Sequence, residues 1–408
     1  MNYNETLEYI HSLGMFSHPA GLERISELLK ALDYPQKSIK AVHIAGTNGK
    51  GSTATFISSV FRAAGLKTAL FISPFVIDFR ERIQINGEFI PKVKLCKLAE
   101  RVKRTGIAVT EFEFITAVAF LYFAEEKCDI AVIETGLGGR LDATNTLTDV
   151  CASVITKIGL DHTAILGNTF TQIATEKCGI IKNDNTICAV NQPKTAFAVI
   201  KKQSKKLIVP DKRSLKIIKT DISGNEFYYR GVHYKTALGG KYQIDNALTA
   251  IETIHHCGIE IDEECIVRGL ADASFPARLE VLHRNPLIVL DGAHNPDGGA
   301  ALEIAMRKYS GKITAIVGMM KDKNCSSFLK KVLPHCKSVI TVRASSAPRS
   351  LEAQTLADLC RKYCDDVVAS DELSKAIEIA LKQAKDEPIF IFGSLYLASS
   401  VRSLLLAL

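Results

Sequence analysis

The sequence predicts an α/β protein with two domains, the first built on a mostly parallel sheet and the second on a smaller doubly wound sheet. The chain has 408 residues, more than one hydrophobic core usually serves, and 47% of them are hydrophobic. Short apolar strands alternate with helical segments over residues 40–272, and the alternation starts again at residue 287. An apolar strand also runs into a glycine-rich turn and then a helix at residues 42–53, a pattern typical of phosphate-binding loops.

The glycine-rich turn after the first strand is the strongest single signal. Its three glycines allow a tight turn that aims several N–H groups at one anion, and the helix that follows adds its positive N-terminal end. Lys50 supplies a full charge, and Ser52 or Thr53 supplies a hydroxyl for Mg²⁺. The strict loop pattern is not met, since Ile44 replaces its first glycine and Gly51 separates Lys50 from Ser52. We therefore predict a variant P-loop-type domain. The alternative is an ordinary glycine-rich turn.

Hydrophobic periodicity predicts the remaining elements of the first domain. The polar segment 78–87 is predicted to be a long loop that closes in a turn at Asn86 and Gly87. The pattern changes to a small antiparallel excursion at about 215–238. Predicted strands are 40–45, 68–72, 129–134, 151–157, 186–190 and 207–209, and predicted helices lie within 4–32, at 91–104, 111–126, 243–257 and 262–272, and between the glycine-rich turn and Gly65.

A fresh strand after residue 284 starts the second domain, which we predict to be Rossmann-like. We assign residues 1–278 to the first domain and residues 279–408 to the second, a size within the usual domain range. The predicted strands of the second domain are 287–291, 313–317, 338–342, 366–369 and 389–393.

Charge and cysteine content exclude several classes of protein. The formal net charge of +7 is modest and spread along the chain, and the basic stretch 201–206 is interpreted as a solvated helix end, so we expect no nucleic-acid partner. The 11 cysteines form no Cys-x-x-Cys pair, and neither Cys360 with Cys364 nor the cluster 255–257 completes a zinc site. The chain opens without an apolar signal core and holds no run that could span a bilayer. We expect a cytoplasmic protein with no membrane partner.

Two further motifs follow predicted strands. Gly136, Gly138 and Gly139 suggest a dinucleotide fingerprint, but Leu141 occupies the place of the third glycine, so binding of NAD is weakly supported. The segment 291–296 places Asp, His and Asn at the carboxyl end of a strand, where open α/β sheets bind ligands. The alternative for this segment is a capped helix start, with Asn before Pro at the first helical position.

Taken together, these segments resemble the folylpolyglutamate synthase and dihydrofolate synthase family, a branch of the Mur ligase superfamily. The resemblance spans nearly the whole chain, and the motifs occur in the family's order. Residues 46–52, Gly-Thr-Asn-Gly-Lys-Gly-Ser, match the family's phosphate loop letter for letter, and residues 134–145 are similar to its second signature. Further matches are 159–162, 173–180, 246–247, 276–280, 291–296 and 393–396.

The resemblance implies an ATP-dependent ligase that adds L-glutamate to dihydropteroate, to the glutamate tail of reduced folates, or to both. Residues 139–145 look more like the bacterial bifunctional enzymes, which favours both activities. ATP would phosphorylate the substrate carboxylate, and the glutamate amine would attack the acyl phosphate, releasing ADP and phosphate. The implied partners are these small molecules alone, and we expect a monomer.

The same resemblance assigns the nucleotide and metal residues. Two Mg²⁺ sites are implied, one at Ser52 and a second at Glu134 and His162 with Ser73 nearby, although histidine is an unusual ligand for this hard cation. Lys177 would be carbamylated, which requires a neutral amine and hence a depressed pKa. The nucleotide would be bound by Gly46, Thr47, Asn48, Gly49, Lys50, Gly51, Ser52, Asn246, Arg278 and Asp291.

Substrate residues are implied on both domains. Phe112 and Asp142 would face the pterin-bearing substrate, and His294 and Ser394 would hold the incoming glutamate. The residues implied in catalysis are Lys50, His162, Lys177, Arg278 and His294. The chain departs from the usual family residue at Phe75, Cys178, Tyr242, Phe275 and Ala277, and the change of histidine to Phe75 removes a hydrogen-bonding group from the substrate loop.

Three other interpretations remain open from the sequence. Another amino-acid ligase of the same superfamily, of the muropeptide type, shares the motifs. A P-loop nucleotide switch or binding protein needs the loop but has no use for Glu134, His162 and Lys177 together. A dehydrogenase would need the glycine fingerprint that Leu141 interrupts.

Overall fold

The structure is a computed structural model that describes residues 1–14, 21–182, 184–345 and 349–406. The chain divides into two compact units that interleave along the sequence. Unit 1 comprises Met1–Leu215, Tyr229–Tyr234 and Asp245–Ala273, and unit 2 comprises Lys216–Tyr228, Lys235–Ile244 and Ser274–Leu408. We keep the division at residues 278 and 279 as a proposal for the domains. Within the described ranges, no helix is long and apolar enough to cross a membrane.

Unit 1 is built on an eight-stranded sheet in which β1 lies between β5 and β6. The strand order is β4-β3-β2-β5-β1-β6-β7-β8, and the strands from β2 to β8 in that order pair in parallel while β3 and β4 are antiparallel. The mostly parallel sheet predicted from the sequence is confirmed. The strands are β1 (Lys40–Ala45), β2 (Thr68–Phe71), β3 (Ile83–Ile85), β4 (Glu88–Phe89), β5 (Ile130–Glu134), β6 (Asp149–Ile155), β7 (Asn185–Cys188) and β8 (Lys206–Ile208).

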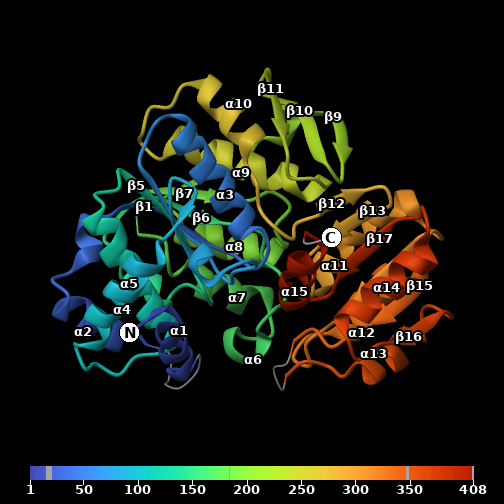
Figure 1. The fold of residues 1–408 in the computed structure, drawn as a ribbon. Coiled ribbons are helices and arrows are strands. Elements are labelled where there is room, and N and C mark those ends of the chain that lie inside the picture. The colour runs from blue at the N-terminus through green and yellow to red at the C-terminus, as the bar shows by residue number, and fades with distance from the viewer. Residues whose placement is uncertain (15–20, 183, 346–348, 407–408) are drawn as a thin grey trace. The chain divides into compact units, whose positions relative to one another are not determined.

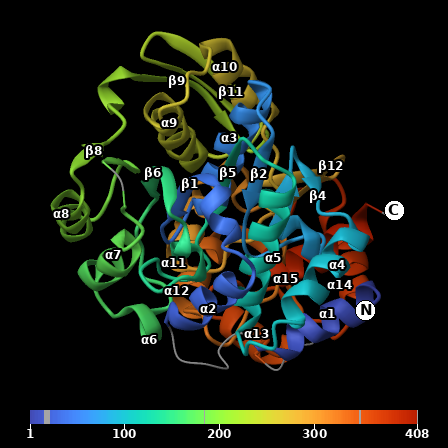
Figure 2. The same cartoon turned by 90° about the vertical axis from the view of Figure 1, so that its left-hand side faces the viewer.

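Helices cover both faces of this sheet (Figure 1). Helix α3 packs against α10 on one face, and α9 and α10 lie side by side there in two views (Figure 1, Figure 2). Helix α5, apolar along nearly its whole length, is buried in a core on the other face with side chains of β1, β2 and β5. The helices are α1 (Tyr3–Ser12), α2 (Glu23–Ala31), α3 (Lys50–Ala63), α4 (Lys92–Lys103), α5 (Glu111–Glu125), α6 (Thr163–Leu166), α7 (Phe170–Cys178), α8 (Lys194–Gln203), α9 (Lys241–His256) and α10 (Glu263–Asp272).

Two predicted segments differ from the structure. The helical pattern within 4–32 forms α1 and α2, and residues 15–20 between them lie outside the described residues. The segment 78–87, predicted as a loop, contains a 3₁₀ turn at Phe79–Arg82 and strand β3. Its closing turn is confirmed, since Asn86 and Gly87 take φ of 54° and 84° and join β3 to β4, as a two-residue hairpin turn requires. The short alternation in β3 was masked by the charged residues that precede it.

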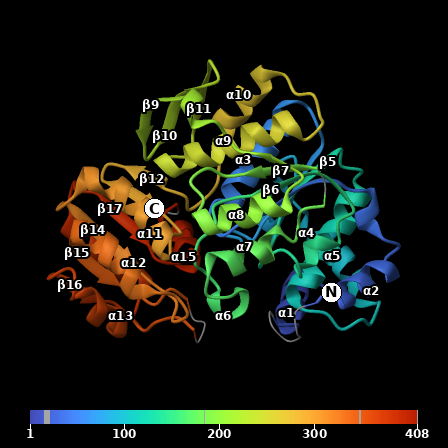
Figure 3. The same cartoon turned by 180° about the vertical axis from the view of Figure 1, so that it is seen from behind.

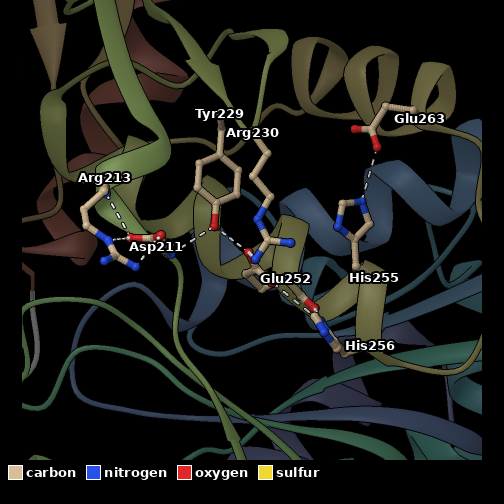
Figure 4. A network of polar contacts seen from close by, with 8 residues as sticks. All are labelled: Asp211, Arg213, Tyr229, Arg230, Glu252, His255, His256 and Glu263. Atoms are coloured by element: carbon tan, nitrogen blue, oxygen red, sulfur yellow. Dashed lines mark hydrogen bonds and ion pairs between the residues drawn. The ribbon is translucent and has the colours of Figure 1, made fainter.

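The predicted excursion at about 215–238 is a three-stranded sheet in the order β11-β10-β9. Its strands are β9 (Leu215–Asp221), β10 (Gly224–Tyr229) and β11 (Val232–Thr236). The residues of this sheet that belong to unit 1 contact α9 and α10 through two glutamates. Figure 4 shows the first of these contacts, between Tyr229 and Glu252. The Tyr229 hydroxyl donates to Glu252 at 2.5 Å and the Tyr234 hydroxyl donates to Glu263.

The histidines at 255 and 256 belong to the same network of polar contacts. His255 Nε2 lies 3.3 Å from Glu263, and His256 Nδ1 lies 2.8 Å from the main-chain oxygen of Glu252. No group of three or more His, Cys, Asp or Glu among the described residues could hold a metal ion. His255 therefore joins the end of α9 to Glu263 at the start of α10, and His256 contacts the main chain of α9 one turn earlier.

Unit 2 contains a six-stranded sheet in the order β12-β13-β17-β14-β15-β16, and Figure 3 shows its last four strands following one another. Only β12 is antiparallel, so the predicted doubly wound sheet is confirmed with one added edge strand. Helices α11 and α12 share a hydrophobic core with β13, β14 and β17. The elements are β12 (Glu280–Arg284), β13 (Leu287–Leu290), α11 (Pro296–Met306), β14 (Ile313–Val317), α12 (Cys325–Val332), β15 (Cys336–Thr341), α13 (Ala353–Cys360), β16 (Val367–Ala369), α14 (Leu373–Ala384), β17 (Ile389–Phe392) and α15 (Leu395–Leu405).

Candidate active site

The predicted phosphate loop connects β1 to α3 at the point where the strand order of the sheet reverses. A Cβ on Gly46 would lie 1.8 Å from Oγ1 of Thr156, and one on Gly49 would lie 2.3 Å from Oδ1 of Asn246. Gly49 also takes a φ of 87°, which other residues rarely adopt. Only glycine fits at these two positions. The close approach of Thr156 and Asn246 therefore explains why the loop has glycines at positions 46 and 49.

Hydrogen bonds to the segment that follows β6, the strand next to β1, hold the loop in place. The backbone N–H groups of Thr47 and Asn48 donate to the main-chain oxygen of Lys157 at 2.9 and 3.1 Å, and the Thr47 hydroxyl donates to Gly159 at 3.1 Å. The loop ends at α3, whose first-turn N–H groups have no partner within the helix. Ser52 lies in that first turn and is buried. The loop thus presents the start of a 14-residue helix, an arrangement that favours an anion.

A carboxylate from the neighbouring strand lies beside the loop lysine. Glu134 ends β5, and its Oε1 is 3.6 Å from Lys50 Nζ. Its Oε2 accepts a hydrogen bond of 3.2 Å from the backbone N–H of Ser73. Three predicted residues are therefore brought together, although Ser73 contributes its backbone in this contact.

Lys177 reaches the same loop from the end of α7. Its Nζ donates a hydrogen bond of 2.7 Å to the main-chain oxygen of Gly46, and the side chain is buried. Burial and the Lys50 cation lower the pKa of Lys177, and the carboxylates of Asp161 and Asp142 raise it. The result is a pKa lowered to about 7. Near neutral pH, a substantial fraction of this amine is unprotonated and can act as a nucleophile.

Asp142 and Phe112 line the segment 136–145 that follows β5. Oδ2 of Asp142 accepts from the Leu137 N–H at 2.8 Å, and its Oδ1 accepts from the N–H and hydroxyl of Thr144 at 3.0 and 2.5 Å. Burial raises the pKa of the Asp142 carboxyl, while these hydrogen bonds lower it. The Phe112 ring packs against Gly136, where a Cβ would lie 2.5 Å from the ring. The aspartate is thus strongly engaged by its own loop.

The loop that contains the atypical Phe75 forms an aromatic cluster. The ring centroids of Phe75 and Phe79 are 5.8 Å apart in an edge-to-face arrangement. The Arg82 guanidinium lies 5.3 Å from the Phe75 centroid. Replacing histidine by phenylalanine therefore keeps a ring that packs on a neighbouring ring and on a cation.

His162 is the predicted residue with the least support from the geometry. It is exposed, precedes the short helix α6, and takes a φ of 50°. By contrast, Glu134 and Ser52 offer the oxygen atoms that Mg²⁺ prefers. The residues beside the loop thus fit a magnesium ion, with Glu134 as the best placed ligand.

The predicted residues of unit 2 also gather at the ends of neighbouring strands. Asp291 follows β13, is buried, and accepts hydrogen bonds of 2.8 Å from the N–H groups of Leu279 and Ala293. Burial raises the pKa of its carboxyl and the Arg278 charge lowers it. His294 Nδ1 lies 2.9 Å from the Gly292 oxygen, and a Cβ on Gly292 would lie 2.7 Å from Nη1 of Arg278.

The remaining residue of this set, Ser394, begins α15 after the neighbouring strand β17. Its hydroxyl accepts a hydrogen bond of 3.1 Å from the N–H of Tyr396. The N–H of Gly393 donates to the oxygen of Ala293 at 3.0 Å, which places the end of β17 next to the loop after β13. These links bring Arg278, Asp291, His294 and Ser394 into one region of unit 2.

Sequence reasoning missed the residues that support the loop from β6. Thr156 and Lys157 follow β6, which is adjacent to β1. Gly46 packs on Thr156, and the N–H of Thr47 donates to the main-chain oxygen of Lys157. The carboxyl end of β6 lies where the strand order reverses, and ligands bind at such positions in open α/β sheets. This position is the signal that could have indicated the two residues. That position is known only when the order of the strands is known.

Comparisons with known proteins identify the family of this chain. Residues 44–254 match the Mur ligase middle domain, and residues 277–395 match the Mur ligase glutamate ligase domain. The chain is 37% identical to the folylpolyglutamate synthase of Lacticaseibacillus casei, covering 100% of this chain and 99% of that protein. It is 35% identical to the dihydrofolate synthase/folylpolyglutamate synthase of Bacillus subtilis (strain 168), covering 98% of each chain.

A solved structure shares the fold over the same length. The structure of E. coli FolC in complex with DHPP and ADP matches with a TM-score of 0.89 at 28% identity, covering 100% of this chain and 98% of that one. The two matched domains and the two relatives that cover nearly the full chain show the same family. The chain therefore belongs to the folylpolyglutamate synthase and dihydrofolate synthase family of Mur ligases.

Proposed function

We propose that this protein is an ATP-dependent ligase that joins L-glutamate both to dihydropteroate and to the glutamate tail of reduced folates. The observation that carries the proposal is the cluster at the phosphate loop, where Lys50, Glu134 and the buried Lys177 lie within contact distance of the loop or of one another. The relatives named as dihydrofolate and folylpolyglutamate synthases support the substrates. The FolC complex with DHPP and ADP supports the use of a nucleotide.

The loop and its helix bind the ATP phosphates in this proposal. Lys50 neutralises charge on the transferred phosphoryl group, because phosphoryl transfer depends mainly on positioning and charge stabilisation. Arg278 is assigned a bidentate contact with phosphate from unit 2, and Asn246, which packs on Gly49, a contact with the nucleotide. Asp291 is assigned to the nucleotide as well.

Magnesium is assigned to two sites. Ser52 and Glu134 are the residues whose oxygens fit the ion, with Ser73, His162 and Lys177 as the further ligands that the family implies. When bound, Mg²⁺ would withdraw charge from the phosphate oxygens and align them. The chain's own part is to place Glu134 beside Lys50 and to bury the site.

Lys177 is assigned as a carbamate. Its unprotonated Nζ attacks CO₂: a nitrogen–carbon bond forms, one carbon–oxygen π bond becomes the carboxylate, and one proton leaves the nitrogen, so that a neutral amine becomes an anion. The lowered pKa of Lys177 supports this assignment, because only the free amine reacts.

The acceptor and the amino acid occupy separate groups of residues. The pterin-bearing carboxylic acid is assigned to the segment of Phe112 and Asp142 in unit 1. Glutamate is assigned to His294 and Ser394 in unit 2, with its amine attacking the acyl phosphate. A monomer located in the cytoplasm remains the expectation for the whole protein.

Product analysis tests the proposal directly. The protein is incubated with ATP, Mg²⁺, L-glutamate and either dihydropteroate or a reduced folate, and mass spectrometry measures the amide product. We expect one glutamate added to dihydropteroate and further glutamates added to the folate. Product from a UDP-muropeptide and an amino acid, with none from either pterin substrate, would replace this proposal by the muropeptide ligase, and phosphate release without any amide would indicate a nucleotide switch.

A further inference from the structure

His43 is a fully buried imidazole in β1 that none of the roles above uses. Its residue has 0% exposure, and its Nε2 lies 2.8 Å from the hydroxyl oxygen of Thr144. Its Nδ1 is buried and has no hydrogen-bond partner among the described residues. Burying a ring nitrogen without a hydrogen-bond partner is unfavourable in free energy. The contact of Nε2 with Thr144 is therefore the feature from which we infer the role of His43.

The direction of the Thr144 hydroxyl proton determines whether His43 donates or accepts in this hydrogen bond. That hydroxyl has one proton and lies 2.5 Å from Oδ1 of Asp142, which also accepts from the Thr144 N–H. With its proton directed to the carboxylate, the hydroxyl can only accept from the ring. His43 therefore donates through Nε2–H, and Nδ1 is the unprotonated nitrogen of the ring.

The charge state of the ring is fixed by its surroundings. Burial and, to a smaller extent, the nearby Lys182 cation together lower the pKa of His43 to about 3. Lys182 is itself held by the main-chain oxygens of Asn145 and Leu147. The imidazole is thus neutral near pH 7.

The receiving carboxylate determines the shape of the segment 136–145. Asp142 joins the start of this segment at Leu137 to its end at Thr144. The same segment is tied to the end of α7, since the Arg140 N–H donates to Glu176 at 2.8 Å and the Asn145 amide donates to Gly179 at 3.1 Å. A change in the hydrogen bonds of Asp142 would therefore alter the conformation of the whole segment.

We propose that His43 is a positioning residue for the acceptor substrate, which acts by fixing the Thr144 hydroxyl on Asp142 and hence the shape of the segment 136–145. The inference rests on the proposed function for the identity of the substrate. It links the strand that leads into the phosphate loop to the segment assigned to the acceptor, through three side chains in the order His43, Thr144, Asp142.

Two substitutions of similar size separate the hydrogen bond from packing. His43→Gln keeps an N–H donor at the distance of Nε2, whereas His43→Leu fills the space without a donor. We expect His43→Leu to raise the KM for dihydropteroate at least tenfold with the KM for ATP within twofold of the wild type, and His43→Gln to restore the dihydropteroate KM to within about threefold. Equal acceptor KM values in wild type and His43→Leu, or equal rises of both KM values in the two variants, would overturn the inference.

A measurement without turnover keeps the inference separate from the proposed function. In protein with ¹⁵N-labelled histidine, the signals lost in His43→Gln belong to this ring, and we expect them to report a neutral ring protonated at Nε2 that does not titrate between about pH 6 and 8. A second test is the thermal stability of His43→Leu, Thr144→Val and the double variant, in which coupled residues give a double variant little less stable than the worse single one.

The outcomes of these two tests are independent of whether dihydropteroate is the substrate. An Nδ1-protonated or titrating ring, or fully additive losses in the double variant, would overturn the arrangement itself. Should the wild type form no pterin amide while both tests succeed, the proposed function fails and the link from His43 to Asp142 stands as a property of the fold.

Discussion

Lys177 Nζ donates a hydrogen bond of 2.7 Å to the main-chain oxygen of Gly46, so the end of α7 is joined to the first residue of the phosphate loop. Replacing Lys177 by Ala removes this link and the amine assigned to carbamylation. We expect amide formation to fall at least a hundredfold, measured by mass spectrometry with saturating substrates, and a short carboxylic acid added to the assay to restore part of it.

The exposed Lys202 provides a matched control for that substitution, because Lys202→Ala removes the same chemical group from a helix surface. Its turnover should equal that of the wild type. Unimpaired turnover in Lys177→Ala would contradict the assigned role of the amine.

Gly49→Ala should weaken nucleotide binding by at least tenfold. The new Cβ would lie 2.3 Å from Oδ1 of Asn246 and would force a φ of 87° on alanine. Gly65→Ala is the control, since Gly65 takes a similar φ of 82° but has open space around its Cβ position. Both variants should lose about 1–2 kcal/mol of unfolding free energy from backbone strain, and calorimetric titration with ADP should show weakened binding in Gly49→Ala alone.

Removing the buried carboxylate of Glu252 should destabilise the protein. The Tyr229 hydroxyl donates to Oε1 of Glu252 at 2.5 Å, and Nη2 of Arg230 lies 2.8 Å from the same oxygen. Glu252→Ala leaves a buried hydroxyl without an acceptor, which we expect to cost about 2 kcal/mol in urea denaturation. Glu252→Gln keeps an acceptor and should lose less.

The exposed pair of Asp358 and Arg361 serves as the reference for Glu252. Asp358→Ala should change the unfolding free energy by less than about 0.5 kcal/mol, as is usual for exposed ion pairs. Similar losses in Asp358→Ala and Glu252→Ala would show that the network in Figure 4 contributes no more than a surface ion pair.

His43 predicts a specific dependence of stability on pH. Its pKa is about 3 in the folded protein and has a reference value of 6.5, so between these values the unfolded chain binds the extra proton. The contribution of the neutral ring to stability is therefore lost as pH falls below 6.5. Relative to His43→Gln, the wild type should lose about 1 kcal/mol of unfolding free energy between about pH 7 and about pH 5.5. Parallel pH profiles of the two proteins in urea denaturation would contradict the lowered pKa.

The strand, loop and helix around the phosphate site could be predicted because their information is local. β1 spans Lys40–Ala45 as the apolar run indicates, and α3 starts at Lys50 directly after the glycines. The close approach of Asn246 to Gly49 was not predictable in the same way. Nearly two hundred residues separate the two, and only the packing of α9 places the amide there.

Motif resemblance identified residues without giving their surroundings. It named Lys177 and Asp142, but the bond from Lys177 to Gly46 joins residues 131 apart in sequence. Asp142 is held by hydrogen bonds from Leu137 and Thr144, which no spacing rule indicates. His43 lies within the predicted strand 40–45, and an isolated histidine carries no pattern that would indicate its contact with Thr144.

The packing of α10 on α3 has a consequence for the synthesis of this protein. Gly269 of α10 lies so close that its Cβ would fall 2.4 Å from Cα of Val60, and α10 begins about 200 residues after α3 ends. At a translation rate of 5–20 residues per second, the helix of the phosphate loop waits roughly ten to forty seconds before its covering helix is made. The apolar side chains of Phe56, Ile57 and Phe61 lie on the waiting helix. Ribosome-bound chains that stop before residue 263 should therefore recruit chaperones, and chains long enough for residues 263–272 to have left the ribosome should release them.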